Sequence, residues 1–190
     1  MPSPENISPE PLSILMKKLE VAGIDTSKWG IGDTKTLAHL LKEIQEGESI
    51  LHESENGELV REMHAVTAEI FYISPEGQTM MLKEEKQVFK DGRERRRLHS
   101  GSVSGRMKIG ENPAKTMLRE IKEELGIDGN LELAEVAVEE SAEDSPSFPG
   151  LKMHKTLYKF RATLRPEQFK SEGYVERQEG KDTYFVWEGI

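Results

Sequence analysis

A short, sharply bounded helix predicted over residues 113–125 constrains this chain more than any other feature. Asn112 precedes it and can serve as the N-cap, because an Asn side chain accepts from the free N–H groups of the first turn. Pro113 suits the first helical position, where its missing N–H would be unpaired anyway. Gly126 follows Leu125 and can adopt the left-handed conformation that ends a helix.

Three glutamates of this helix stand where helix stability alone would not place them. At about 100° per residue, Glu120, Glu123 and Glu124 are predicted on the side opposite an apolar stripe. They lie near the negative end of the helix dipole, and Glu120 repels Glu124 by about 0.2–0.5 kcal/mol. A solvated acidic face is one interpretation; a site for Mg²⁺ or Mn²⁺, which prefer carboxylate oxygens, is the other. The stripe consists of Ala114, Leu118, Ile121 and Leu125.

Around this helix, the pattern of apolar residues and turns predicts a mostly β protein with two helices in front. The first helix carries Leu12, Leu15 and Leu19 and ends near Gly23; the second begins at Asp33 or Thr34 and ends at Gly47. Strands are predicted over 49–52, 59–61, 66–73, 79–82, 87–89, 95–98, 131–138, 155–164 and 183–188, with a short helix near 166–169. We expect an N-terminal helical extension over residues 1–47 and a main domain over 48–190.

Composition excludes several classes of protein. The 190 residues contain no cysteine, which excludes a disulfide scaffold, a thiol nucleophile and zinc sites that use sulfur. A net charge of −9 argues against general nucleic-acid binding. The apolar stretches are far shorter than the roughly 20 residues that cross a bilayer, and the first residues lack the pattern of a secretory signal. We therefore expect a soluble, cytoplasmic protein with no membrane contact.

The spacing within residues 105–127 is more specific than an acidic helix. It runs Gly, five residues, Glu, seven residues, Arg-Glu-Ile, one residue, Glu-Glu, one residue, Gly-Ile. This segment resembles the Nudix box, with every specified position filled. The resemblance implies an α/β fold of the α+β kind: an α/β/α sandwich around a mixed β-sheet, in which the box forms a loop–helix–loop. It also implies hydrolysis of a diphosphate linkage in a nucleoside diphosphate joined to another group, with Mg²⁺ or Mn²⁺ as cofactor.

The match to the motif implies a role for each of the three helix glutamates. Glu120 and Glu124 would be the principal metal ligands. Glu123 would be a further ligand or the base that activates water. These roles agree with the chemistry, because diphosphates are anionic and a metal that neutralises them lowers the barrier to attack.

Other positions of the box would support these carboxylates. By the same resemblance, Arg119 would hold them in place, through Glu111. Gly105 would permit a tight loop that brings the carbonyl of Ser104 into the metal shell. Gly126 would end the helix directly behind the site.

A basic band leads into the box. Residues 83–108 contain nine Lys or Arg and four Asp or Glu, and this band can attract a phosphorylated ligand. A charged edge strand that discourages aggregation is the competing interpretation. Strand alternation places Arg95 and Arg97 on one face and Arg96 on the other. The predicted phosphate contacts are Arg95, Arg97, Arg106 and Lys108.

Several residues outside the box are open candidates for other roles. A further catalytic carboxylate is sought among Glu139, Glu140, Glu143, Glu176, Glu179 and Asp182. The five histidines have no metal-ligand spacing and are expected to be isolated: His39, His52, His64, His99 and His154. Trp29 and Phe148 are more simply explained by packing than by stacking on a base.

Two alternative functions and the role of residues 1–47 stay open. The chain would be a catalytically silent nucleotide-binding or regulatory module if the box supported no turnover, although the box is intact. A prenyl-diphosphate isomerase on the same fold is disfavoured, since that branch uses a catalytic cysteine. Residues 1–47 would provide a homodimer contact, a lid over the site or a cover for a sheet edge.

Overall fold

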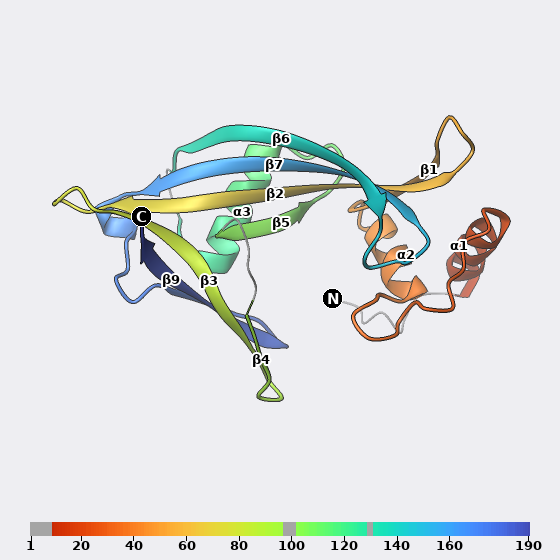
Figure 1. The fold of residues 1–190 in the computed structure, drawn as a ribbon, viewed down its shortest axis with the longest axis horizontal. Coiled ribbons are helices and arrows are strands. Elements are labelled where there is room, and N and C mark those ends of the chain that lie inside the picture. Colours follow the sequence, from red (N-terminus) through yellow and green to blue (C-terminus); the bar gives the residue numbers. More distant parts are fainter. Residues whose placement is uncertain (1–8, 97–101, 129–130) are drawn as a thin grey trace. The chain divides into compact units, whose positions relative to one another are not determined.

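The computed structural model describes residues 9–96, 102–128 and 131–190. It confirms the predicted fold class, an α+β protein with one large mixed sheet and few helices (Figure 1). The helices are α1 Pro9–Val21, α2 Leu37–Gln45, α3 Pro113–Leu125 and the 3₁₀ turn η2 Pro166–Gln168. The strands are β1 Ile50–Glu53, β2 Leu59–Ile73, β3 Thr79–Phe89, β4 Glu94–Arg95, β5 Val103–Met107, β6 Leu133–Asp144, β7 Lys152–Leu164, β8 Tyr174–Arg177 and β9 Lys181–Gly189.

The main path of the sheet follows the order β6-β7-β2-β3-β9-β8, while β1 and β5 pair with β2 and β4 pairs with β3. The chain divides into two compact units, and β2, β5, β6 and β7 contribute residues to both. The first unit comprises residues 1–64, 106–110 and 139–156; the second comprises 65–105, 111–138 and 157–190. The predicted boundary after residue 47 stays a prediction. No helix in the described ranges is both long and apolar enough to span a bilayer.

The first unit has its own apolar core. Helices α1 and α2 lie side by side, as Figure 1 shows, and bury Leu19 and Leu40 almost completely. Phe148, from the segment after β6, is fully buried in the same cluster. The Trp29 ring lies 5.0 Å from the Phe148 ring, and its Nε1 donates to the carbonyl of Pro149 at 2.9 Å. Trp29 and Phe148 are therefore packing residues of this unit.

Helix α2 begins later than the sequence predicts. Thr36 is the N-cap: its hydroxyl accepts from the N–H of His39, whose Nδ1 accepts in turn from the N–H of Thr36. The predicted cap, Thr34, instead donates its hydroxyl to the carbonyl of Lys28 at 2.8 Å and accepts from the N–H of Ile31. The prediction of a cap at Asp33 or Thr34 is wrong because Thr34 closes the preceding loop.

A buried carboxylate ties several segments of the first unit together. Glu43 of α2 is 4% exposed, and its Oε1 lies 2.5 Å from both Lys35 Nζ and Arg106 Nη1. Its Oε2 accepts from Nη2 of the buried Arg61 at 2.7 Å. Burial raises the pKa of Glu43, but the hydrogen bond from Lys35 and the charges of Arg106 and Arg61 outweigh it and lower the pKa to about 2. The Glu43 carboxylate is therefore ionised, and the three cations offset the cost of burying its charge.

We predict that Glu43→Ala destabilises the protein by about 3–5 kcal/mol, because it leaves Arg61 buried without its carboxylate partner. Urea denaturation measures the free energy of unfolding. Glu46→Ala is the matched control on the same helix: Glu46 pairs with Lys42 at 3.7 Å, near the surface, and should change stability by about 0.5 kcal/mol or less. Equal losses in the two variants would contradict the role of the cluster.

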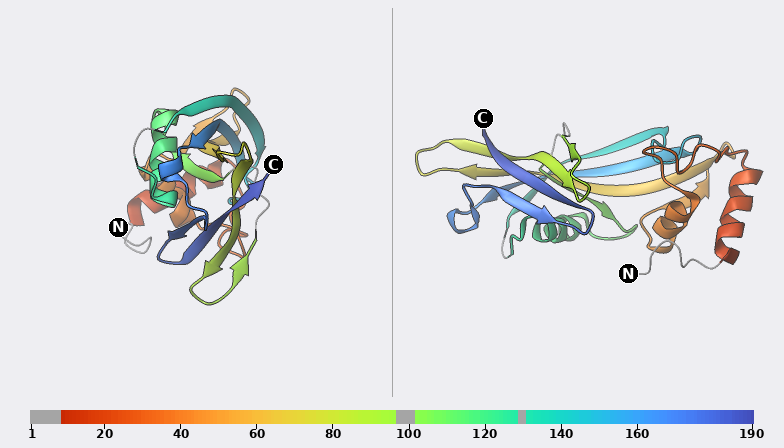
Figure 2. Two further views of the ribbon diagram at one scale, coloured as in Figure 1. Left: turned by 90° about the vertical axis from the view of Figure 1, so that its left-hand side faces the viewer. Right: turned by 90° about the horizontal axis from the view of Figure 1, so that it is seen from below.

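The second unit is built on three antiparallel strands. β3 pairs with β9 along almost its whole length, β8 pairs with the other edge of β9, and α3 packs against β8 (Figure 2). β3 is one continuous strand where the sequence predicts two, because the polar stretch between them stays hydrogen-bonded to β9. β5 and β8 are absent from the sequence prediction, since both are short and lack a run of apolar residues.

Candidate active site

Helix α3 begins and ends as predicted. Asn112 is the N-cap and accepts from the N–H of Lys115 at 3.0 Å, and Pro113 occupies the first turn. Gly126 has a φ of +66°, and its N–H donates to the carbonyl of Lys122 at 2.9 Å. The ends of the helix follow from local chemistry alone, which explains the agreement.

The rotation of α3 about its axis differs from the prediction. Met117 is fully buried, whereas Leu118, expected in the core, is 38% exposed. The buried side therefore follows Met117, Ile121 and Leu125. Glu120 and Glu124 border that side and are partly buried, and Glu123 is exposed. The prediction that all three glutamates face away from the core is wrong, because Ile121 and Leu125 can form a stripe with either Met117 or Leu118, and the structure buries Met117.

Gly105 allows the chain to pass directly beside Glu120. A Cβ at position 105 would lie 2.2 Å from Cδ of Glu120, far closer than any real contact. Gly105 has no positive φ, so the need for glycine here comes from the close approach and not from backbone conformation. The preceding residue, Ser104, is exposed on β5. The loop backbone is thus held against the carboxylate of Glu120.

Arg119 connects two acidic positions of the motif. Its Nη2 lies 3.0 Å from Oε1 of Glu120 and 3.7 Å from Oε2 of Glu111. The Thr116 hydroxyl donates to the same Glu111 oxygen at 3.1 Å. Arg119 therefore orients Glu120, while Glu111 and Thr116 hold the start of the helix to the same cluster.

The environment of Glu120 disfavours its ionised form. Burial is the main cause that raises the pKa of Glu120 to about 7. The Arg119 guanidinium opposes the shift, and the carboxylates of Glu123, Glu111 and Glu176 add to it. The attraction of Arg119 is therefore smaller than the combined effect of burial and like charge.

The pKa of Glu124 is raised further than that of Glu120. Burial again contributes most, followed by the charges of Glu176, Glu120 and Glu84, and together they raise the pKa of Glu124 to about 8. Lys181 opposes this shift weakly. Glu176, one of the candidates outside the box, thus acts on both partly buried glutamates of α3.

Glu84 is a candidate site residue that the sequence does not indicate. It lies on β3, and its Oε1 is buried with no hydrogen-bond partner in the described part of the chain. Its Oε2 accepts from Nε2 of Gln87 at 3.4 Å. A register shift between Glu84 and Lys86 places Glu84 opposite Phe185 and Gln87 opposite Thr183, so both polar residues share one face. In the sequence, Glu84 belongs to a charged run typical of an exposed strand, and only the register reveals it.

Polar side chains form a row across four strands on this face. Glu176 of β8 lies opposite Thr183 of β9, Thr183 lies opposite Gln87 of β3, and Gln87 lies opposite Arg95 of β4. Arg95 Nη2 donates to Oε1 of Gln87 at 3.1 Å. Gln87 and Thr183 are each 2% exposed. The structure therefore brings Arg95 of the basic band to the same face as Glu176.

The other predicted site residues are not shown beside the glutamates of α3, or lie outside the described residues. Arg106 belongs to the first unit, where its Nη1 contacts Glu43 and Glu48. Lys108 is exposed after β5, whereas Arg97 and His99 lie outside the described residues. Among the carboxylates outside the box, Glu139, Glu140 and Glu143 belong to the first unit, Glu179 lies between β8 and β9, and Asp182 pairs with Lys90 and Arg177.

Three histidines expected to be isolated are grouped in the first unit. His52 and His64 lie 3.6 Å and 3.2 Å from the two carboxylate oxygens of Glu62, and the ring of His154 lies 6.4 Å from that of His52. Pairing of both β1 and β7 with β2 brings them together, which their sequence positions do not indicate. Over the described ranges, no three His, Asp or Glu side chains converge as a preformed set of metal ligands.

The α+β fold, with paired glutamates on a helix that follows a close-packed glycine loop, is the arrangement that the resemblance to the Nudix box implies. The family model described as NUDIX domain matches residues 63–184, more than half of the chain, and the protein belongs to this family. At the level of reaction class it is a pyrophosphohydrolase, and the family generally uses divalent metal ions. None of the curated proteins matches the sequence.

Solved structures with similar folds have low sequence identity. An Ap4A hydrolase from C. elegans is 15% identical, with 66% of this chain and 79% of that chain covered and a TM-score of 0.39. The NUDIX domain of NrtR from Shewanella oneidensis, complexed with ADP ribose, is 10% identical, with 67% and 73% covered and a TM-score of 0.41. The E. coli dihydroneopterin triphosphate pyrophosphohydrolase is 17% identical, with 67% and 79% covered and a TM-score of 0.38.

We predict that the metal-free protein loses stability as the pH rises from about 4.5 to about 8. In the unfolded chain Glu120 and Glu124 ionise near their ordinary pKa of 4.5, whereas the folded protein retains their protons to a pKa of about 7 and about 8. The folded state therefore binds more protons in this window, so the free energy of unfolding falls with pH. Urea denaturation in EDTA across this range measures the slope.

In the same experiment, Glu124→Gln should be more stable than the unmodified protein at pH 8 by about 1–3 kcal/mol, since it removes one buried charge. Glu167→Gln is the control, because the Glu167 side chain is 68% exposed and its replacement should leave the slope unchanged. An identical slope for Glu124→Gln and the unmodified protein would contradict the assignment.

Proposed function

We propose that this protein hydrolyses a diphosphate linkage in a nucleoside diphosphate joined to another moiety, such as ADP-ribose or a nucleotide sugar, with Mg²⁺ or Mn²⁺ as cofactor. The observation that carries the proposal is the pair of partly buried glutamates, whose pKa values of about 7 and about 8 reflect burial and mutual repulsion. A bound cation stabilises the ionised form of such carboxylates, because it offsets both burial and the repulsion between them.

Three features of the site fit a divalent metal. Glu120 and Glu124 offer hard oxygen ligands, and Glu84 contributes a buried oxygen without a hydrogen-bond partner in the described residues. Gly105 lets the loop backbone approach the carboxylate of Glu120, where a Cβ would clash with it. Glu120 and Glu124 would hold the metal, with the Ser104 carbonyl as a further proposed ligand. When bound, the metal neutralises diphosphate charge and makes water more acidic.

The protein supplies orientation and a proton acceptor. Arg119 holds Glu120 at 3.0 Å and limits the directions its carboxylate can take. Glu123 is exposed on the same helix, so its carboxylate is free to receive the proton of an attacking water; we propose it as the base. Glu176 acts on both glutamates and is the preferred candidate for a further carboxylate outside the box.

Phosphate recognition is proposed for the basic band. Arg95 reaches the polar row that includes Glu176, and its hydrogen bond to the buried Gln87 fixes the guanidinium. A fixed guanidinium suits phosphate oxygens, which it can bind with two parallel hydrogen bonds. Arg97, Arg106 and Lys108 stay predicted contacts. Cytoplasmic location, homodimer formation and the role of residues 1–47 also stay predictions.

Substitution of the glutamates separates metal binding from proton transfer. Glu120→Gln and Glu124→Gln should each lower kcat by about 10²–10³-fold and abolish the rise in melting temperature caused by Mg²⁺. Glu123→Gln should lower kcat by at least about a hundredfold and keep that rise, since it removes only the base. Assays use Mg²⁺ with ADP-ribose, nucleotide sugars and nucleoside triphosphates, and far-ultraviolet circular dichroism confirms that each variant is folded.

Glu167→Gln serves as the exposed control and should behave like the unmodified protein. Near-normal activity of Glu124→Gln would contradict the metal assignment. Metal binding by the unmodified protein without turnover of any substrate would instead identify a binding module.

Arg95 and Arg96 offer a matched pair for testing phosphate recognition. Arg95→Met should raise KM about tenfold with a smaller effect on kcat, because it removes a charge-assisted contact to the substrate. Arg96 instead pairs with Glu85, with 3.5 Å between Nη1 and Oε1. Because it is not expected to contact the substrate, Arg96→Met should leave KM unchanged. Equal KM values for the two variants would contradict a contact between Arg95 and the substrate.

A further inference from the structure

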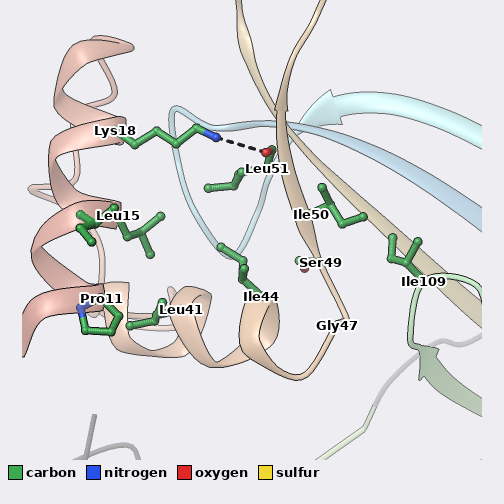
Figure 3. Close-up of a pocket in the computed structure, with 11 residues that line it drawn as sticks. Pro11, Leu15, Lys18, Leu41, Ile44, Gly47, Ser49, Ile50, Leu51 and Ile109 are labelled. Carbon is green, nitrogen blue, oxygen red and sulfur yellow. Dashed lines mark hydrogen bonds between the residues drawn. The ribbon is translucent and has the colours of Figure 1, made fainter. Parts of the chain in front are cut away.

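An apolar pocket lies within the first unit, and its residues take no part in the diphosphate site. The pocket has a volume of about 750 Å³ and is surrounded by α1, α2 and the start of β1 (Figure 3). Figure 3 shows Leu15 and Leu41 from the two helices and Leu51 from β1 directed toward the same space. A volume of this size lies within the range of pockets that bind small molecules, about 300–1,000 Å³.

The wall and the edge of this pocket differ in exposure. Leu15 and Leu41 are each 6% exposed, so they form a wall that already belongs to the core. Ile14 of α1 and Ile50 of β1 also line the pocket but are 65% and 41% exposed. Folding thus leaves apolar side chains of the lining in water, where a ligand would cover them.

Lys18 adds a single positive charge to this apolar lining. Figure 3 shows its side chain running from α1 along the edge of the pocket, and its Nζ donates to the carbonyl of Leu51 at 3.3 Å. In the described ranges no carboxylate lies within ion-pair distance of Lys18. The carbonyl is a neutral acceptor, so the ammonium charge stays available for an anionic group at the opening.

We propose that this pocket binds a small amphiphile with a hydrocarbon chain and a terminal carboxylate. The chain lies against Leu15, Leu41 and Leu51, and the carboxylate pairs with Lys18 at the edge. An apolar lining with one cation matches this ligand in both polarity and charge. A partner protein is a poorer match, because stable protein interfaces bury about 1,200–2,000 Å², much more than this pocket offers.

Isothermal titration of the full-length protein with sodium decanoate tests the proposal. We expect saturable binding of one molecule per chain. Decan-1-ol, which has the same chain and no charge, should bind about three- to tenfold more weakly, because it cannot pair with Lys18. Absence of saturable decanoate binding would overturn the proposal.

Variants at exposed positions locate the ligand without disturbing the core. Ile50→Glu places a carboxylate in the pocket lining and should weaken decanoate binding at least about tenfold, since it repels the ligand and reduces apolar contact. Val21→Glu, on α1 but outside this pocket and 82% exposed, should leave binding unchanged. Melting temperatures close to that of the unmodified protein confirm folding.

Lysine variants test the charge. Lys18→Met should abolish the preference for decanoate over decan-1-ol, whereas Lys17→Met, on the same helix and outside this pocket, should retain it. Equal effects of the two lysine variants, or of Ile50→Glu and Val21→Glu, would overturn the assignment. A dimer that Ile50→Glu dissociates would assign the pocket to a second copy of the chain and would also overturn it.

Discussion

The second unit depends on one unfavourable interaction, the burial of Glu120 and Glu124 near other carboxylates. Burial and like charge raise the pKa of Glu120 to about 7 and that of Glu124 to about 8. The surrounding structure keeps the two side chains in place in spite of this cost. Asn112 and Gly126 fix the ends of α3, and Gly105 lets the loop pass beside Glu120. The caps of α3 and the close-packed loop at Gly105 thus fix the backbone around the two glutamates that repel each other.

The first unit contains a buried glutamate with the opposite environment. Glu43 is 4% exposed, but Lys35, Arg61 and Arg106 surround it and hold its pKa at about 2. Burial disfavours the charge of Glu43 as it does that of Glu124, so the difference lies in the cations nearby. The protein can therefore compensate a buried carboxylate when its role is structural. Leaving Glu120 and Glu124 largely uncompensated is the pattern expected of groups that act on a ligand.

The sequence predicted those parts of the structure that depend on nearby residues. The ends of α3 follow from Asn112, Pro113 and Gly126, and the motif follows from spacing along one helix and its loop. The face of α3 that is buried could not be predicted, because either Met117 or Leu118 can extend the stripe of Ile121 and Leu125, and only the packing of the folded unit buries Met117. Glu84 was missed for the same reason, since its position depends on the register of β3 with β9.

Whether Glu120 and Glu124 hold a divalent cation can be seen directly in crystals soaked in Mn²⁺ and measured near the manganese absorption edge. We expect an anomalous difference peak within about 2.3 Å of an oxygen of each glutamate. Crystals of Glu124→Gln soaked in the same way should lose the peak. Manganese bound only at the histidine group around Glu62, or no peak beside α3, would contradict the account.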